Sequence, residues 1–143
     1  MKKIIVIATV LLVSSAIMRA DDRPVTFAQL PAAVQNFINV NYPSDKISYA
    51  TVDDDFIRPD YNVVLVSGVR LQFTNSGALE KIESRAGVPD SFVPVQIKDY
   101  VKMHYPESFI IEYEVGKKRY EIKLSNRLEL KFNRNFNLVE VDD

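Results

Sequence analysis

The stretch YEIKLSNRLELKF, residues 120–132, contains the strand pattern that decides the fold. Apolar and charged residues alternate along both of its arms, which is typical of β-strands with one buried and one solvent-exposed face. The arms are separated by Ser, Asn and Arg at 125–127, and short polar residues of this kind favour a tight turn. The stretch therefore predicts a β-hairpin.

An earlier part of the chain repeats this pattern. Its apolar positions 61, 63, 65, 71 and 73 correspond in order to 120, 122, 124, 130 and 132. Self-similarity of this kind indicates a structural unit that occurs twice.

A helix precedes each set of strands. Apolar residues at 30, 34, 37 and 38 have the spacing that places them on one helix face. Pro31 is tolerated in the first turn, where its missing N–H would have no partner. Pro43 ends the helix, because the residue before a proline is pushed out of helical geometry. Pro94 and Pro106 bound the same pattern in the second copy.

These patterns predict an α+β fold: a tandem repeat of one helix plus about four antiparallel strands, with the helices packed on one face of the sheet. We expect a first repeat at 24–86 and a second at 90–143, which together form one compact domain. Because a unit of about 60 residues is only marginally stable alone, we expect the two sheets to join or abut. The predicted strands lie near 47–53, 60–67, 69–74, 78–84, 108–115, 119–125, 127–132 and 137–141.

The first twenty residues have the features of a secretory signal peptide. Two lysines are followed by an apolar run at 4–13, and Ser14, Ser15 and Arg19 interrupt this run before it reaches the roughly 20 residues that span a membrane. An uncleaved anchor is the alternative. With no cysteine in the chain, lipid attachment at the first mature residue is excluded. We expect cleavage after Ala20 and a periplasmic or secreted product without membrane contact.

Composition excludes several partner classes. The formal net charge is −1 and becomes more negative when Lys2, Lys3 and Arg19 are removed with the signal peptide. Such a charge does not favour binding to nucleic acid or to an anionic membrane surface. Because there are no disulfides, stability must come from packing.

The helix boundaries at Leu30-Pro31 and Tyr42-Pro43, together with the hairpin of residues 120–132, resemble the PepSY-like family. This family is compared with the β-lactamase-inhibitor protein and occurs mostly in exported proteins of Bacteroidetes-type bacteria. The resemblance covers nearly all of the mature chain and implies its fold. The shared motifs are structural, so they imply no particular activity. The last hairpin departs from the family pattern, because residues 135–137 contain no glycine.

Catalytic chemistry finds little support in the sequence. The chain has one histidine and no cysteine, and no nucleophile, tuned acid–base pair or metal set can be recognised. His104 is best interpreted as a surface residue at a helix end. We predict that the protein is not an enzyme and needs no cofactor, and a hydrolase is disfavoured.

The strongest local anomaly is an acidic run at Asp53, Asp54 and Asp55. A calcium loop starting at Asp53 would need glycine at its sixth place and glutamate at its twelfth, and the chain has Arg58 and Val64 there. The simplest interpretation is a solvated connection that keeps a strand edge from pairing.

A functional interpretation of the same loop rests on its length, because 52–60 is longer than its counterpart at 114–119. Its acidic tip is followed by Phe56 and Arg58, and charge beside an apolar anchor suits insertion into a partner's cleft. In the inhibitor with which the family is compared, a hairpin loop of the first repeat enters the enzyme's active site. The resemblance points to the same role here.

One strand face of the first copy is less charged than that of the second. It carries Val64, Val66, Arg70 and Gln72, whereas the same face of the second copy carries Glu121, Lys123, Glu129 and Lys131. This face could bind a partner. Alternatively, the two valines pack under the neighbouring unit or the start of the chain.

We therefore predict a non-enzymatic extracytoplasmic binding module, with an inhibitor-like mode as one form of it, that engages an envelope or secreted protein. The candidate partner-binding residues are Asp53, Asp54, Asp55, Phe56, Arg58, Val64, Val66 and Arg70. The alternative is a periplasmic small-ligand or metal-binding protein, motivated by the carboxylate run.

Overall fold

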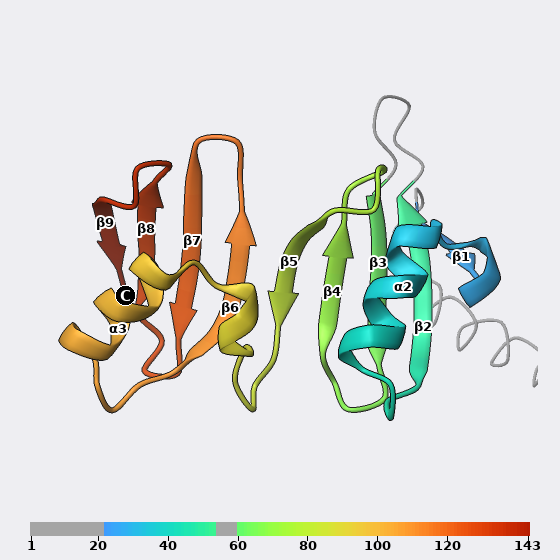
Figure 1. Cartoon of the computed structure of the whole chain (residues 1–143), viewed down its shortest axis with the longest axis horizontal. Coiled ribbons are helices and arrows are strands. Elements are labelled where there is room, and N and C mark those ends of the chain that lie inside the picture. Colours follow the sequence, from blue (N-terminus) through green and yellow to red (C-terminus); the bar gives the residue numbers. More distant parts are fainter. Residues whose placement is uncertain (1–21, 54–59) are drawn as a thin grey trace, which may run out of the picture.

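The computed structural model describes residues 22–53 and 60–143. Within these residues, nine strands form a single sheet in the order β1 to β9, and each strand pairs antiparallel with the next. Both helices lie on the same face of this sheet, with α2 over β2, β3 and β4 and α3 over β8 and β9 (Figure 1). The predicted α+β class and the placement of both helices on one face are confirmed.

After β1, the order of elements is a helix followed by four strands, twice. The first half contains β1 Asp22–Val25, α2 Ala32–Asn41, β2 Ile47–Asp53, β3 Asp60–Leu65, β4 Arg70–Phe73 and β5 Leu79–Glu83. The second half contains α3 Val95–His104, β6 Ile110–Val115, β7 Arg119–Leu124, β8 Glu129–Asn133 and β9 Leu138–Asp142. The 3-10 turns η2 Phe27–Gln29 and η3 Asp90–Phe92 precede the two helices.

The two halves join through the pair β5–β6. Ile82 lies opposite Tyr113, with Lys81 opposite Glu114 and Glu83 opposite Glu112. The two sheets were expected to join or abut, and in the structure they join into one sheet.

Strand β1 is absent from the sequence prediction. Its four residues include Pro24, and a proline normally argues against a strand because it cannot donate to the ladder. An edge strand tolerates it, since one side of its backbone faces solvent. β1 occupies that position, where it pairs with β2 through Arg23 opposite Val52 and Val25 opposite Ala50.

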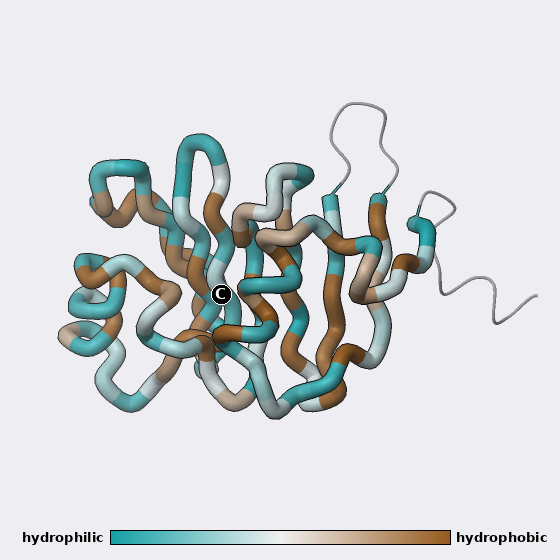
Figure 2. The backbone as a smooth tube through the Cα atoms, turned by 45° about the vertical axis from the view of Figure 1, so that its right-hand side comes forward, coloured by the Kyte–Doolittle hydropathy of each residue, from teal (hydrophilic) through white to brown (hydrophobic). Residues whose placement is uncertain are grey.

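The core lies between the helices and the sheet. Val34 and Ile38 of α2 and Ile97 and Val101 of α3 are buried, as the predicted apolar spacing requires. Figure 2 shows hydrophobic residues along the strands and hydrophilic ones in many of the connections. The buried strand residues of this core are Ala50, Val63, Leu65, Leu71, Phe73, Ile82, Ile110, Tyr113, Tyr120, Ile122, Leu124, Leu130 and Phe132.

Two hairpin turns differ between the halves in their backbone chemistry. Gly68 and Gly77 have φ of 98° and 89°, and the corresponding Arg127 and Phe136 have φ of 75° and 65°. Positive φ costs a residue with a side chain about 1–2 kcal/mol, whereas glycine adopts it readily. The second half therefore bears strain that the first half avoids.

Replacing Arg127 with glycine should raise the free energy of unfolding by roughly 0.5–1 kcal/mol, because relief of the left-handed conformation exceeds the entropy cost of a glycine. Urea denaturation with an unchanged slope would measure this. Phe136→Gly is the control: it also relieves strain, but it loses the ring of Phe136, which stacks on Tyr120 at 5.2 Å, and it should not stabilise. A less stable Arg127→Gly variant would contradict the strain argument.

Candidate functional site

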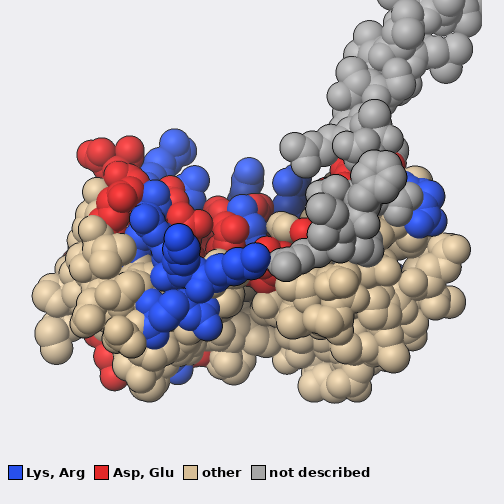
Figure 3. All heavy atoms as spheres, turned by 90° about the horizontal axis from the view of Figure 1, so that it is seen from above, with Lys and Arg blue, Asp and Glu red and all other residues tan. Residues whose placement is uncertain are grey.

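The sheet face opposite the helices is crossed by two continuous rows of side chains, because strand residues alternate between the faces. In order from β2 to β9, one row contains Thr51, Asn62, Gln72, Lys81, Glu114, Glu121, Lys131 and Glu140. The other row contains Tyr49, Val64, Arg70, Glu83, Glu112, Lys123, Glu129 and Asp142. Seen from above, many acidic and basic atoms gather on this side of the molecule (Figure 3).

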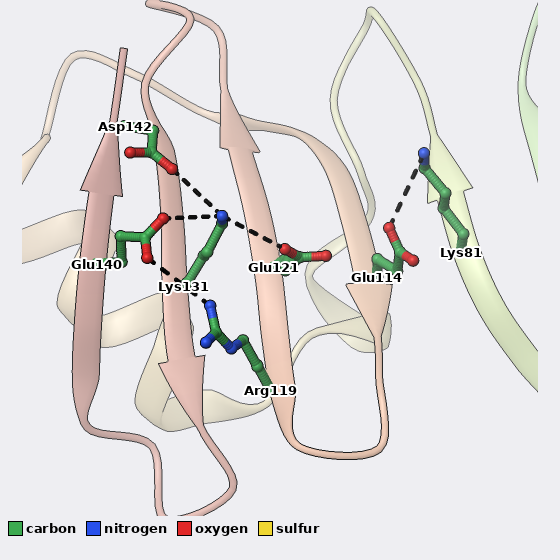
Figure 4. Close-up of polar contacts among 7 residues, drawn as sticks. All are labelled: Lys81, Glu114, Arg119, Glu121, Lys131, Glu140 and Asp142. Atoms are coloured by element: carbon green, nitrogen blue, oxygen red, sulfur yellow. Dashed lines mark hydrogen bonds and ion pairs between the residues drawn. The ribbon is translucent and has the colours of Figure 1, made fainter.

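In the second half, long charged side chains of these rows pair with one another. The Lys131 Nζ lies 2.9 Å from an oxygen of Glu140, 3.2 Å from one of Asp142 and 3.9 Å from one of Glu121 (Figure 4). Hydrogen bonds to Glu140 and Asp142 raise the pKa of Lys131 above its ordinary value. Arg119 adds an ion pair to Glu140 at 3.8 Å. This part of the face is filled by its own charges.

At the junction of the halves, Lys81 is likewise surrounded by carboxylates. Its Nζ lies 2.8 Å from Glu112, 3.3 Å from Glu83 and 4.0 Å from Glu114. Burial favours the neutral amine, but the hydrogen bonds to Glu112 and Glu83 outweigh it and raise the pKa of Lys81. Burial also raises the pKa of Glu114, against the attraction of Lys81. The charged network of the second half therefore ends at β5.

The first half has a hollow of about 640 Å³ on the same face. The register shows its cause: Thr51 and Asn62 stand where the second half has Glu114 and Glu121. Shorter side chains leave this space unfilled. We call it the first-half hollow, and its lining consists of Asp22, Pro24, Tyr49, Ala50, Thr51, Asp53, Asp60, Asn62, Val63, Val64, Arg70, Leu71, Gln72, Lys81 and Glu83.

Two side chains of the hollow are suited to binding a partner. Tyr49 is 54% exposed, and tyrosine offers a large apolar surface with a polar tip. Arg70 is also exposed and forms no hydrogen bond or ion pair with any part of the chain that the structure describes. Arginine and tyrosine are enriched among the residues that contribute most to protein interfaces.

Carboxylates lie at one end of the hollow. Asp53 of β2 is paired in register with Asp22 of β1 on one side and with Asp60 of β3 on the other. Across residues 22–53 and 60–143, no group of three or more His, Cys, Asp or Glu side chains is arranged to hold a metal ion.

The structure brings three of the predicted site residues together. Asp53, Val64 and Arg70 all line the first-half hollow. Val66 does not, because it follows the last residue of β3 and is 68% exposed, so the interpretation that it packs under another element is wrong. The predicted residues Asp54, Asp55, Phe56 and Arg58 lie outside the described residues.

Sequence reasoning missed other members of the hollow, namely Tyr49, Thr51 and Asn62. The available signal was their spacing, since Thr51 lies two residues from both Tyr49 and Asp53, and period two places all three on one face. His104 is exposed at the end of α3, where its ring packs on Tyr100 at 4.2 Å. None of the helices in the described part of the chain is long and apolar enough to cross a membrane.

Comparison with known proteins assigns the fold to a family. A family model described as "Putative beta-lactamase-inhibitor-like, PepSY-like" matches residues 17–57 and 59–140. A search of curated proteins gives no match.

Three crystal structures of Bacteroides proteins are similar to the chain. A "putative periplasmic protein from DUF2874 family" of Bacteroides vulgatus is 34% identical, with a TM-score of 0.82, and the match covers 88% of this chain and 100% of that one. A "putative calcium-regulated periplasmic protein" of Bacteroides thetaiotaomicron is 35% identical, with a TM-score of 0.81 and coverage of 86% and 98%. A "putative periplasmic protein of unknown function" of Bacteroides vulgatus is 27% identical, with a TM-score of 0.80 and coverage of 85% and 99%. The chain therefore belongs to the PepSY-like, β-lactamase-inhibitor-like family.

Proposed function

We propose that the protein is a non-enzymatic binding module of the bacterial envelope that uses the first-half hollow to engage a protein partner. The observation that carries this proposal is the contrast between the halves. At the same register positions, the second half carries glutamates that pair with Lys81 and Lys131 and leave a hollow of only about 60 Å³, whereas the first half leaves one of about 640 Å³. A concave site with a few convergent polar groups is the first place to expect ligand or partner binding, so the hollow marks the first half as the candidate binding surface.

The chemistry of the hollow suits a polypeptide better than a small charged metabolite. Its lining combines Val64 with neutral polar Asn62 and Gln72, together with Arg70 and acidic residues. A mixed lining of this kind resembles protein interfaces, which have apolar centres and polar rims. An inhibitor-like mode, in which this face covers a partner's active site, is one form of the proposal.

Two observations support a periplasmic or secreted location. The signal-like first twenty residues and the periplasmic descriptions of two relatives at least 34% identical agree with a periplasmic or secreted protein. We further propose that the two halves arose from one helix-plus-four-strand unit, so that the hollow is a specialisation of the first copy.

The test uses two variants that alter the same row of the open face in the two halves. The double variant Tyr49→Ala with Arg70→Ala changes the hollow, and Lys123→Ala with Glu129→Ala changes two positions of this row in the second half that do not line the hollow. The mature protein is immobilised and exposed to envelope extract of the source organism, and captured proteins are quantified by mass spectrometry. We expect at least one specific partner whose recovery falls about tenfold or more with the first variant, because interface tyrosine and arginine residues each contribute on the order of 1–2 kcal/mol or more.

The control variant should retain that partner. Equal recovery with both variants, or equal loss with both, would contradict a role of the hollow. Circular dichroism checks that each variant is folded.

Calcium binding is a second candidate. It rests on the relative described as calcium-regulated, since the described aspartates that share a register row, Asp22, Asp53 and Asp60, are not arranged to hold a metal ion. Calorimetric titration with calcium chloride decides this candidate, since no heat and no change in melting temperature would remove it.

A further inference from the structure

The two outer edges of the sheet are built differently. In an antiparallel sheet, the backbone N–H and C=O groups of successive residues point to alternate sides of the strand. This rule shows which residues of the edge strand β1 face outward. In the β6–β7 hairpin the Gly116 N–H donates to the Arg119 carbonyl, so the backbone of Glu114 faces β7 and that of Tyr113 faces β5. By the same alternation in β2, the backbone of Thr51 faces β3 and that of Ala50 faces β1.

Pro24 consequently has its backbone on the outer side of β1, because its pairing position is Thr51. A proline there presents no N–H to an incoming strand. Proline on an edge strand is a common device against unwanted pairing. The β1 edge is therefore closed to further strands.

The β9 edge lacks this device. The Asn133 N–H donates to the Asn137 carbonyl, so Lys131 and its register partner Glu140 have their backbones turned toward each other. The backbone N–H and C=O of Val141 are then directed outward. Val139 and Val141 are 52% and 45% exposed, and β-branched residues of this kind favour strand pairing.

The fold contains its own example of how this edge is covered. In the first half, β5 has the place of β9, and Ile82 corresponds to Val141 because each lies opposite the equivalent core leucine, Leu71 or Leu130. Strand β6 pairs with β5, and Ile82 is completely buried. The outer edge of β9 thus has the geometry of a strand that accepts a further antiparallel neighbour.

The charges beside the β9 edge determine which side-chain charge on the added strand would be favourable. On β5, Lys81 lies opposite Glu114 of the incoming β6 and also pairs with its Glu112. On β9, Glu140 occupies the position that Lys81 has on β5, and Asp142 lies two residues further along the strand. The open face beside this edge has four carboxylates, from Glu121, Glu129, Glu140 and Asp142, against the three cations of Lys131, Arg119 and Lys123. Basic residues on the incoming strand would complement this surface, whereas acidic residues would not.

A second copy of the chain does not meet this requirement. Two-fold antiparallel pairing centred on Val141 would place Glu140 of one copy opposite Asp142 of the other. Like charges directly opposite each other destabilise a strand pair. The acidic edge therefore disfavours self-association while it remains open to a basic strand.

We propose that the outer edge of β9 binds an extended basic segment of a partner protein as an added antiparallel strand, with basic, apolar and basic residues opposite Glu140, Val141 and Asp142. Main-chain hydrogen bonds supply affinity in this mode of recognition, and alternate side chains supply specificity. This edge is separate from the first-half hollow, so the two sites can be tested independently.

The test uses two capped peptides based on strand β6. One copies residues 110–115 of this chain, and the other has lysine in place of Glu112 and Glu114. Each peptide is titrated into the isotopically labelled mature protein, and amide resonances are followed by NMR. We expect the lysine peptide to bind at least tenfold more tightly than the glutamate peptide. Its affinity should fall with added salt, and the largest shifts and strongest hydrogen-exchange protection should occur at Val141.

Val141→Pro removes the outward N–H and reproduces the device that Pro24 provides at the opposite edge. This variant should lose at least tenfold in affinity for the lysine peptide, whereas Val141→Ala, which keeps the N–H, should lose less. If Val141→Pro does not fold, Glu140→Gln with Asp142→Asn tests the same proposal, because it should abolish the preference for the lysine peptide. Equal affinity for both peptides, shifts confined to the first-half hollow, or a dimer in analytical ultracentrifugation with no peptide binding would overturn the proposal.

Discussion

Replacing Phe73 with alanine should lower the free energy of unfolding by about 3–5 kcal/mol. The side chain of Phe73 is fully buried and meets the ring of Phe37 from α2 edge-on, with centroids 5.3 Å apart. Its removal leaves a cavity between β4 and the helix and also removes an aromatic contact. Urea denaturation followed by circular dichroism measures the loss.

Phe109→Ala is the control for this prediction, because the side chain of Phe109 is 49% exposed and its truncation should cost much less. The unfolding of Phe73→Ala should remain a single transition, since β5 pairs directly with β6 and the halves share one core. A loss below about 1 kcal/mol, or separate transitions for the two halves, would contradict the description of the core as one cooperative unit.

Replacing Gly77 with alanine should lower the free energy of unfolding by about 2–4 kcal/mol, for two reasons that add. Gly77 has φ of +89°, which strains any residue with a side chain, and an added Cβ would lie only 2.8 Å from the Cβ of Ala33 in α2. The turn between β4 and β5 must therefore move away from the helix or distort. Thermal and urea denaturation of the variant would detect this loss.

Gly68→Ala separates the two causes. Gly68 has φ of +98°, and a Cβ there would meet nothing within 4 Å. This variant should show only the conformational cost of about 1–2 kcal/mol. If both glycine variants lost the same stability, close approach of the turn to α2 would not be the reason for glycine at 77.

The two halves differ on the sheet face away from the helices, where the first half has the larger hollow. Val64 and Arg70 could be selected from sequence because alternation assigns them to the face away from the helices, and Asp53 because it begins an acidic run. Their meeting in one hollow could not be predicted, because it depends on how much volume Thr51 and Asn62 leave between neighbouring strands. Val66 shows the limit of alternation, since the strand ends at Leu65 and the rule no longer applies.

The edges of the sheet illustrate the same limit. The residues of β9 were predicted as a strand from their pattern, but its open outer side is a property of the sheet order. β1 was not predicted, because Pro24 opposes a strand locally and only its position beside β2 makes the strand tolerable.

Local pattern alone was sufficient for the helices, for eight of the strands and for the face of most strand residues outside the β-bulges, because spacing along the chain sets these properties. It was not sufficient for the joining of the halves through Ile82 and Tyr113, for the first-half hollow or for the contrast between the β1 and β9 edges. These features arise from pairing between segments that are distant in sequence, where register and side-chain volume across strands determine what is filled, what is paired and what stays open.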